Sequence, residues 1–319
     1  MHQQRAFLGF THTPLLHVAP LPAAAEATLQ AAIARTRALV REWQPDRILL
    51  IGPDHYNGFV HELMPPFCIG TEATAVGDYL TPTGALNVDE TTALALAEQL
   101  LDSGFDIAVS RRMRVDHGFA QPLMLLWDGL DTPPVVPVFM NAIAWPAVAR
   151  IRRCIEIGDA MGLFLDGIPG RTLLLASGGL SHEPPIPTLQ DSDPGVRERI
   201  MTRTEVTEER RRQRMALATA YGQALARGEP GMKPLNMAWD RRWADAIESR
   251  DLSWFHDQSE ESISRQGGLA AHESKTWLIA RCALSQQPQP SGFRHHQELP
   301  ELIAGFGIMW IASDTEQPR

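Results

Sequence analysis

Four histidines lie in short motifs rich in glycine, proline and polar residues, and each motif closely follows an expected strand. They are His12 in THTP, His55 in PDHYNG, His117 in DHG and His182 in SGGLSH. Neutral imidazole binds metal ions, and its unperturbed pKa of about 6.5 lets it exchange protons near neutral pH. In α/β sheets, the loops beyond the carboxyl ends of the strands form the ligand crevice. We therefore expect these four side chains to converge on one cleft that binds a metal or transfers protons.

No short metal-binding signature accompanies these histidines, since the sequence has no HExxH motif and no histidine pair at i and i+4. Ligands on separate loops would leave no such signature. The carboxylate ligand could be Asp54, Asp116 or Glu273, and the two aspartates could equally be acceptors that fix the orientation of an imidazole. Ser177 or Ser181 could also pair with His182 as a nucleophile, although residues so close in sequence rarely face each other well.

The remaining histidines outside the C-terminal HESKTW string lack this setting. We expect them to be surface or structural residues: His2, His17, His61, His256, His295 and His296. The last two lie in a stretch with proline, glutamine and serine, which predicts a loop.

The elements that must position these motifs are short apolar strands alternating with longer amphipathic helices, up to about residue 190. Strands are expected at Ala6–Phe10, Arg47–Ile51, Ile107–Ser110, Val135–Phe139 and Thr172–Ala176. Helices are expected near 22–43, 89–103, 118–130 and 146–165. This alternation predicts an α/β protein with a central sheet flanked by helices. Segment 56–87, rich in proline, glycine and threonine, departs from the rhythm and is expected to hold short antiparallel strands.

Beyond residue 190 the sequence becomes charged and helical. Segment 194–228 contains the run Glu208–Arg214, which we interpret as a solvated helix face, with a phosphate- or acid-binding patch as the alternative. After a break at Glu229–Pro234, helices are expected around 239–250, 257–265 and 272–284. We predict a single domain of residues 1–319, with an α/β core (1–190) and a mainly helical portion (191–319).

The composition is that of a folded protein, with 319 residues, of which 44% are hydrophobic and 21% charged. With 29 basic and 38 acidic residues the net charge is −9, which argues against a nucleic-acid-binding surface. Three widely spaced cysteines suit a reducing compartment and give no disulfide framework. The sequence shows no signal peptide and no apolar run of about 20 residues, so we expect a cytoplasmic protein without a membrane partner.

Five short strings together resemble the class III extradiol ring-cleaving dioxygenases: Pro53–Phe59 (PDHYNGF), Met64–Ile69 (MPPFCI), Val115–Leu123 (VDHGFAQPL), Ser177–Pro185 (SGGLSHEPP) and His272–Trp277 (HESKTW). The resemblance covers nearly the whole chain and ends with Ile303–Gly307. It implies a ferrous ion, Fe(2+), held by His12, His55 and Glu273, an arrangement that leaves one side of the metal open for a catechol and O2. Because Glu273 lies in the C-terminal helical portion, that portion would close the active site.

The same resemblance assigns acid–base chemistry to the other two histidines. His182 would accept a proton from the catechol and His117 would donate one as the ring opens, although an exchange of the two roles stays open. The implied substrate is 3-(2,3-dihydroxyphenyl)propanoate or 2,3-dihydroxycinnamate, cleaved beside a hydroxyl to a 2-hydroxy-6-oxo-dienedioate in aromatic catabolism. The family also implies a homo-oligomer, for which Trp127, Trp145 and Trp310 are candidate interface residues.

Two other functions fit the same residues. Two histidines and a glutamate can also hold zinc with an activated water, which would give a hydrolase. A non-catalytic relative could use the crevice to bind a ligand, although the presence of all five residues argues against this. A substrate carboxylate requires arginine, lysine or backbone donors. The basic residues nearest the motifs are Lys275, Arg111, Arg112 and Arg114, each of which could equally be a surface or ion-pair residue.

Overall fold

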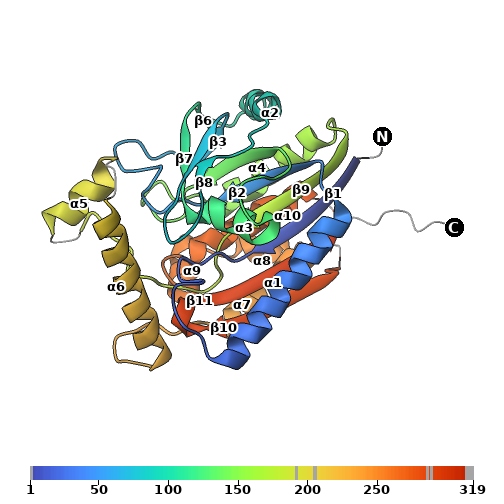
Figure 1. Ribbon diagram of the computed structural model, residues 1–319. Coiled ribbons are helices and arrows are strands. Elements are labelled where there is room, and N and C mark those ends of the chain that lie inside the picture. The colour runs from blue at the N-terminus through green and yellow to red at the C-terminus, as the bar shows by residue number, and fades with distance from the viewer. Residues whose placement is uncertain (1–2, 191–192, 204–206, 285–286, 288–289, 313–319) are drawn as a thin grey trace.

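The computed structural model describes residues 3–190, 193–203, 207–284, 287 and 290–312. Within these residues an eight-stranded sheet has the order β10-β11-β1-β9-β2-β8-β3-β6 and runs through the middle of the molecule (Figure 1). Its four central strands are parallel: β1 (Gln3–Phe10), β9 (Gly170–Ser177), β2 (Arg47–Gly52) and β8 (Val135–Met140). The carboxyl ends of these strands therefore meet at one edge of the sheet.

The outer strands complete the sheet on both sides. They are β3 (Phe67–Gly70), β6 (Ala108–Ser110), β10 (Phe293–Leu299) and β11 (Ala304–Ala312). Strands β3 and β11 run antiparallel to their central neighbours β8 and β1. The sheet is therefore mixed, with its parallel part in the centre where ligand crevices form.

Helices cover both faces of the sheet, as the alternating pattern predicts. In β2, Leu49 and Ile51 join the apolar cluster on one face, and Ile48 and Leu50 join the cluster on the other, because successive side chains of a strand alternate. The first face is covered by α2 (Glu90–Asp102), α4 (Ile151–Leu165) and α10 (Lys275–Leu284). The second is covered by α1 (Ala23–Trp43) and α3 (His117–Trp127).

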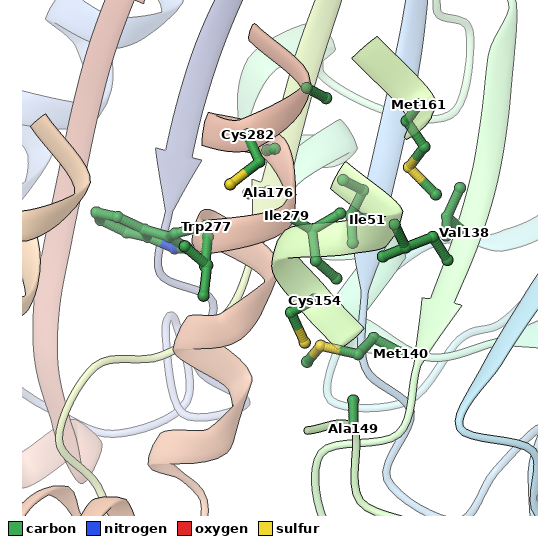
Figure 2. Packing of buried hydrophobic residues seen from close by; sticks show 14 of the residues in the cluster. Ile51, Val138, Met140, Ala149, Cys154, Met161, Ala176, Trp277, Ile279 and Cys282 are labelled. Atoms are coloured by element: carbon green, nitrogen blue, oxygen red, sulfur yellow. The ribbon is translucent and has the colours of Figure 1, made fainter. Parts of the chain in front are cut away.

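Helices α4 and α10 pack closely against each other on the first face. A Cβ atom on Gly158 would lie 2.5 Å from the carbonyl oxygen of Ile279, so only glycine permits this approach. Figure 2 shows Cys154 of α4 and Cys282 of α10 in the packed layer above strand residues such as Val138. This packing fixes α10 relative to the sheet, and with it the residues that immediately precede the helix.

A second sheet of three strands lies beside the first in the described part of the chain. It contains β5 (Thr83–Ala85), β4 (Ala73–Val76) and β7 (Met113–Val115). Strands β4 and β5 are antiparallel, which confirms the expectation for segment 56–87, whereas β3 from the same segment belongs to the main sheet. Strand β7 leads directly into α3 and so positions the start of that helix.

The C-terminal third is helical, with α7 (Met237–Ser249), α8 (Leu252–His256) and α9 (Glu260–Gly267), but it also returns to the sheet as β10 and β11. The predicted loop at His295 and His296 is wrong, because both lie in β10. The sequence of β10 is polar and half-buried, without an apolar alternation to reveal it. Its strand form follows from backbone pairing with β11, from Phe293 opposite Trp310 to Leu299 opposite Ala304.

Two helices stand at the carboxyl-end edge of the sheet, apart from the other helices, on the left of Figure 1. They are α5 (Pro194–Met201) and α6 (Glu208–Ala226), which we call the α5–α6 cover. The backbone N–H groups of His61 and Glu62 donate to the carbonyls of Ile200 and Met201 in α5. Helix α6 packs on the short turn η2 (Pro300–Leu302).

Of the three tryptophans named as candidate interface residues, Trp310 is buried inside the chain and packs edge-on against Trp43, with ring centroids 6.0 Å apart. It is therefore a core residue, and that expectation is wrong. Trp145 is partly exposed. No helix in the described residues is long and apolar enough to cross a bilayer.

Candidate active site

The structure brings the four predicted histidines together in one cavity of about 660 Å³ at the carboxyl-end edge of the sheet. His12, His55 and His182 follow β1, β2 and β9, which are neighbours in the sheet. His117 arrives differently, as the first residue of α3. Of the seven other histidines, His2 lies outside the described residues and the rest do not line the cavity: His17, His61, His256, His272, His295 and His296.

Glu273 lies at the centre of this group. It belongs to the short turn η1 (Ala271–Ser274) directly before α10 and is 1% exposed. Its Oε2 is 3.4 Å from His12 Nε2, and its Oε1 is 3.1 Å from His55 Nε2 and 3.4 Å from His182 Nε2. The backbone N–H of Gly179 donates to Oε2 at 3.0 Å. Of the three candidate carboxylates, Glu273 is therefore the one that lies within 3.4 Å of three of the imidazoles, whereas Asp116 groups with Asp78 and His117.

The two aspartates have local roles instead. Asp54 closes a turn by accepting the backbone N–H groups of Asn57, Gly58 and Phe59. Asp116 is the N-cap of α3 and accepts from Gly118 N at 2.9 Å. Its Oδ2 lies 3.1 Å from Nδ1 of His55. Asp116 therefore orients that imidazole, one of the two roles left open by the sequence.

The orientation of His12 and His55 suits metal binding. Nδ1 of His12 is 2.9 Å from Ser177 Oγ and Nδ1 of His55 is held by Asp116, so both Nε2 atoms face Glu273. Their ligand nitrogens and that of His117 lie within 4.8 Å of one another. Two imidazole nitrogens and one carboxylate in a buried pocket form a donor set for a divalent transition metal. The residues present therefore fit a metal ion.

The charges of His12 and Glu273 agree with this fit. Burial lowers the pKa of His12 to about 3, so its imidazole is neutral and its lone pair is available to a metal. Burial alone would raise the pKa of Glu273, but His182, His12 and His55 outweigh it and hold the pKa well below its usual range. Glu273 is thus an anion at neutral pH. Burial alone would lower the pKa of His55, but Asp116 and Glu273 raise it well above its ordinary value, so a metal ion bound there would displace a proton from this ring.

His117 forms a dyad with an aspartate that the sequence did not point to. Its Nδ1 lies 2.6 Å from Asp78 Oδ2, and its backbone N–H donates to Oδ1 at 2.8 Å. Its Nε2 is buried and has no hydrogen-bond partner within the described residues, and its ring stacks on His55 with centroids 4.3 Å apart. The only signal for Asp78 was an acidic residue after a glycine in the irregular segment 56–87, because its partner is 39 residues away.

His182 is held from the other side of the cluster. Its Nδ1 donates to the carbonyl of Leu180 at 2.8 Å, which leaves the lone pair on Nε2. Burial alone would lower the pKa of His182, but Glu273 and the bond to Leu180 raise it above its ordinary value. The His182 imidazole is therefore more basic than that of a free histidine.

The serines do not pair with His182 as nucleophiles. Ser177 Oγ contacts His12, whereas Ser181 Oγ donates to Asp240 Oδ2 at 2.9 Å. Asp240 also accepts Ser181 N at 2.7 Å, so this buried carboxylate, unforeseen from the sequence, fixes the loop before His182.

His272, the neighbour of Glu273, contacts Ser264 Oγ at 2.8 Å. It does not line the cavity.

The basic residues nearest the motifs lie elsewhere. Lys275 is fully buried and donates to the carbonyl of Ala149 at 2.6 Å, and Arg111 is exposed and pairs with Glu90 at 3.3 Å. Neither these two nor Arg112 and Arg114 line the cavity. The arginines that do line it, Arg199 and Arg214, come from the α5–α6 cover, and only Arg214 belongs to the run Glu208–Arg214 that we interpret as a solvated helix face.

Comparison with known proteins agrees with this site. The model of the LigB family, the catalytic LigB subunit of aromatic ring-opening dioxygenase, matches residues 6–307, and the chain belongs to this family. The protein is thus an extradiol ring-cleaving dioxygenase, as the five motifs indicate, and the family is metal-dependent.

Three relatives carry the same more specific name, 2,3-dihydroxyphenylpropionate/2,3-dihydroxicinnamic acid 1,2-dioxygenase. The one from Comamonas testosteroni is 54% identical over 310 residues, 97% of each chain. That from Burkholderia vietnamiensis is 42% identical over 97% of this chain and 98% of its own. That from Mycolicibacterium paratuberculosis is 41% identical over 95% and 97%. A solved structure of an uncharacterized Escherichia coli K12 protein matches 98% of this chain and 99% of its own at 13% identity and a TM-score of 0.48, too weak to support a conclusion.

Proposed function

We propose that this enzyme uses O2 to cleave 3-(2,3-dihydroxyphenyl)propanoate or 2,3-dihydroxycinnamate beside a hydroxyl, giving a 2-hydroxy-6-oxo-dienedioate. The observation that carries the proposal is the convergence of four imidazoles on the Glu273 carboxylate in one cavity. The name of the Comamonas testosteroni relative, which matches 97% of the chain, supports the choice of substrate.

The proposed metal is ferrous iron, held by His12, His55 and Glu273. Two imidazoles and one carboxylate with open positions are the usual ligand set of non-haem Fe(II) oxygenases. An iron ion held there would supply a binding centre for the catechol oxygens and O2 and a route for electron density between them. Ser177 and Asp116 support this assignment because they hold the two imidazoles with Nε2 facing Glu273.

His182 is the proposed proton acceptor. Since Nδ1 donates to the carbonyl of Leu180, Nε2 is the atom that takes a proton from a catechol hydroxyl. The raised pKa makes the imidazole a stronger base than free histidine, which suits a phenolic proton. The proximity of Nε2 to Glu273, at 3.4 Å, keeps this step beside the proposed iron.

His117 is the proposed proton donor. Asp78 accepts Nδ1–H and fixes the ring, so that Nε2 is the nitrogen left to carry the proton to be delivered. Because Nε2 is buried without a partner among the described residues, its proton is free for an oxygen of the opening ring. Stacking on His55 keeps the donor next to the proposed iron ligands.

The test is to load the protein anaerobically with ferrous iron, add 3-(2,3-dihydroxyphenyl)propanoate, admit O2 and follow oxygen uptake together with the yellow ring-opened product. We expect equal amounts of O2 consumed and product formed. His182→Ala should lower kcat by about 100- to 10,000-fold, the usual contribution of a general base. His256→Ala, at an exposed histidine, is the matched control. Zinc-supported hydrolysis without oxygen uptake would overturn the proposal.

The homo-oligomer, the cytoplasmic location and the absence of nucleic-acid and membrane partners remain predictions from the sequence.

A further inference from the structure

Two arginines of the α5–α6 cover face the same cavity as the histidines. Arg199 comes from α5 and Arg214 from α6, and both are half-buried. The wall between them and the histidines is largely apolar, with residues such as Ile186, Leu217 and Leu302. Among the described residues that line the cavity, these two are the only arginines, and no lysine lines it.

Neither arginine has a hydrogen bond or a salt bridge with any residue that the structure describes. Two other arginines, one just after α5 and one in α6, do have such partners. Arg203 donates to the carbonyl of Gly58 at 2.7 Å, and Arg211 donates to the carbonyl of Val76 at 3.0 Å. These neighbours tie the α5–α6 cover to the loops beside the histidines, whereas Arg199 and Arg214 keep their donors free.

Arg214 and Tyr79 also line a second, smaller pocket together with Asp78, and the positive charge of Arg199 acts on both of them. Burial lowers the pKa of Arg214, and the positive charge of Arg199 lowers it further. Burial and Asp78 raise the pKa of Tyr79 to about 12, against the opposing charges of both arginines. The ring of Tyr79 in turn packs edge-on against His117, with centroids 5.2 Å apart. Tyr79 therefore lies next to both the catalytic cluster and the arginine pair.

Two like charges held together in a half-buried site are unfavourable unless an anion joins them. The charge of Asp78 acts on Arg214, but the two oxygens of Asp78 accept from the backbone N–H and Nδ1 of His117, and no salt bridge to Arg214 is seen among the described residues. An added carboxylate could bind both arginines through charge-assisted hydrogen bonds, which the planar guanidinium favours.

We propose that Arg199 and Arg214 bind the carboxylate of the substrate's three-carbon side chain, which selects acid-bearing catechols. This inference rests on the proposed function, because it assumes that the catechol ring is bound at His12, His55 and Glu273. It assigns a substrate contact to the Glu208–Arg214 run, of which only part is a solvated face. Of the two interpretations of this run, a solvated face and an acid-binding patch, the proposed contact of Arg214 supports the acid-binding patch.

The test compares 3-(2,3-dihydroxyphenyl)propanoate with the neutral 3-ethylcatechol in the iron-loaded enzyme. In Arg199→Met and in Arg214→Met, the ratio of kcat/KM for the acid to that for the neutral catechol should fall about 10- to 100-fold, as expected for a lost hydrogen bond to a charged group. Arg212→Met is the matched control, since Arg212 lies exposed on the same helix and does not line the cavity. Its ratio should stay within about twofold of wild type. An unchanged ratio in the double variant would overturn the inference.

A charge reversal sharpens the result. Arg214→Glu should prefer the cationic 3-(2-aminoethyl)catechol over the propanoate, whereas wild type should prefer the propanoate. Retention of the acid preference would contradict the proposed contact.

A further measurement on wild type alone guards against variants that fold poorly. Turnover of 3-ethylcatechol should be inhibited competitively by 3-phenylpropanoate and much less by 3-phenylpropan-1-ol, which lacks the charge. Equal inhibition by both would overturn the inference while leaving ring cleavage intact. If wild type cleaves neither catechol, it is the proposed function that fails.

Discussion

The two sides of the cavity are built from different kinds of structure. On the sheet side, His12, His55 and His182 follow adjacent parallel strands, and each Nδ1 has a partner within the chain. On the opposite side, the α5–α6 cover presents Arg199 and Arg214 without partners among the described residues. On the sheet side the Nδ1 atoms of the three histidines have partners, whereas on the cover side the guanidinium donors of the two half-buried arginines have none among the described residues.

The difference teaches how reaction and selection can be separated in one cavity. Groups that transfer protons or hold a metal require a fixed orientation, which the strand register and the orienting partners provide. Groups that recognise a side chain need free donors, and a helical cover carries these without disturbing the sheet. We expect substitutions on the sheet side to affect metal binding or kcat, and substitutions on the cover side to affect KM. The four substitutions below run from the largest expected effect to the smallest.

Glu273→Gln removes the central anion while keeping its size. Loss of an outer partner of a metal ligand typically costs about 10- to 100-fold in metal affinity, so loss of the ligand itself should exceed 100-fold. Bound iron after anaerobic loading and gel filtration, measured by atomic spectroscopy, checks this. The control is Glu298→Gln, at an exposed glutamate of β10, which should bind iron like wild type. Undiminished iron in Glu273→Gln would remove Glu273 from the ligand set.

Asp78→Asn should lower kcat about 10- to 100-fold with little change in KM, because the carboxylate acts through His117 and not on the substrate. A purely structural role is excluded by a double-mutant cycle. In a His117→Asn background the same change should cost almost nothing, since the two residues act as one unit. Asp106→Asn, at an exposed aspartate, is the control. Additive losses in the cycle would contradict the dyad.

Gly222→Ala tests the docking of the α5–α6 cover. A Cβ at Gly222 would lie 2.2 Å from the carbonyl oxygen of Glu301, so α6 must shift. We expect the free energy of unfolding to fall by about 1–3 kcal/mol. KM for the propanoate should rise about fivefold, equivalent to about 1 kcal/mol, while bound iron stays the same. Gly129→Ala, where a Cβ meets nothing within 4 Å, is the control. A loss of iron would show that the two sides of the cavity are not separable.

Arg111→Met should have the smallest effect. Arg111 is 68% exposed, pairs with Glu90 on the surface and does not line the cavity. Exposed pairs contribute about 0–1 kcal/mol, so stability should change little and KM for the propanoate should stay within about twofold. A large rise in KM, measured in the same assay, would return the carboxylate contact to the arginines before His117.

The fold was predictable where a strand is buried on both faces. The apolar runs at Arg47–Ile51 and Thr172–Ala176 became β2 and β9 with small changes in length, because a doubly covered strand must be apolar throughout. Strand β10 could not be predicted in this way. It lies at the edge of the sheet, its side chains are polar, and backbone pairing with β11 alone gives it strand form.

The site residues also fall into those that the sequence revealed and those that it did not. The histidines were visible because each follows a recognisable strand or helix signal in a motif of turn-forming residues. Asp78, Asp240, Arg199 and Arg214 carry no such signal. The two aspartates act on partners far away in the sequence, as Asp240 does on Ser181, 59 residues earlier, and the two arginines are proposed to act on the substrate.

The sequence by itself determined the α/β class, the four motif histidines and, through resemblance, the dioxygenase family. The resemblance also implied Glu273 as the carboxylate ligand. Only the tertiary structure placed Glu273 within 3.4 Å of three imidazoles, paired Asp78 with His117 and brought two cover arginines to the cavity. The physical reason is that local patterns encode burial and turns, whereas hydrogen bonds and charge pairs depend on distances that exist only after the strands have taken their register and the helices have packed.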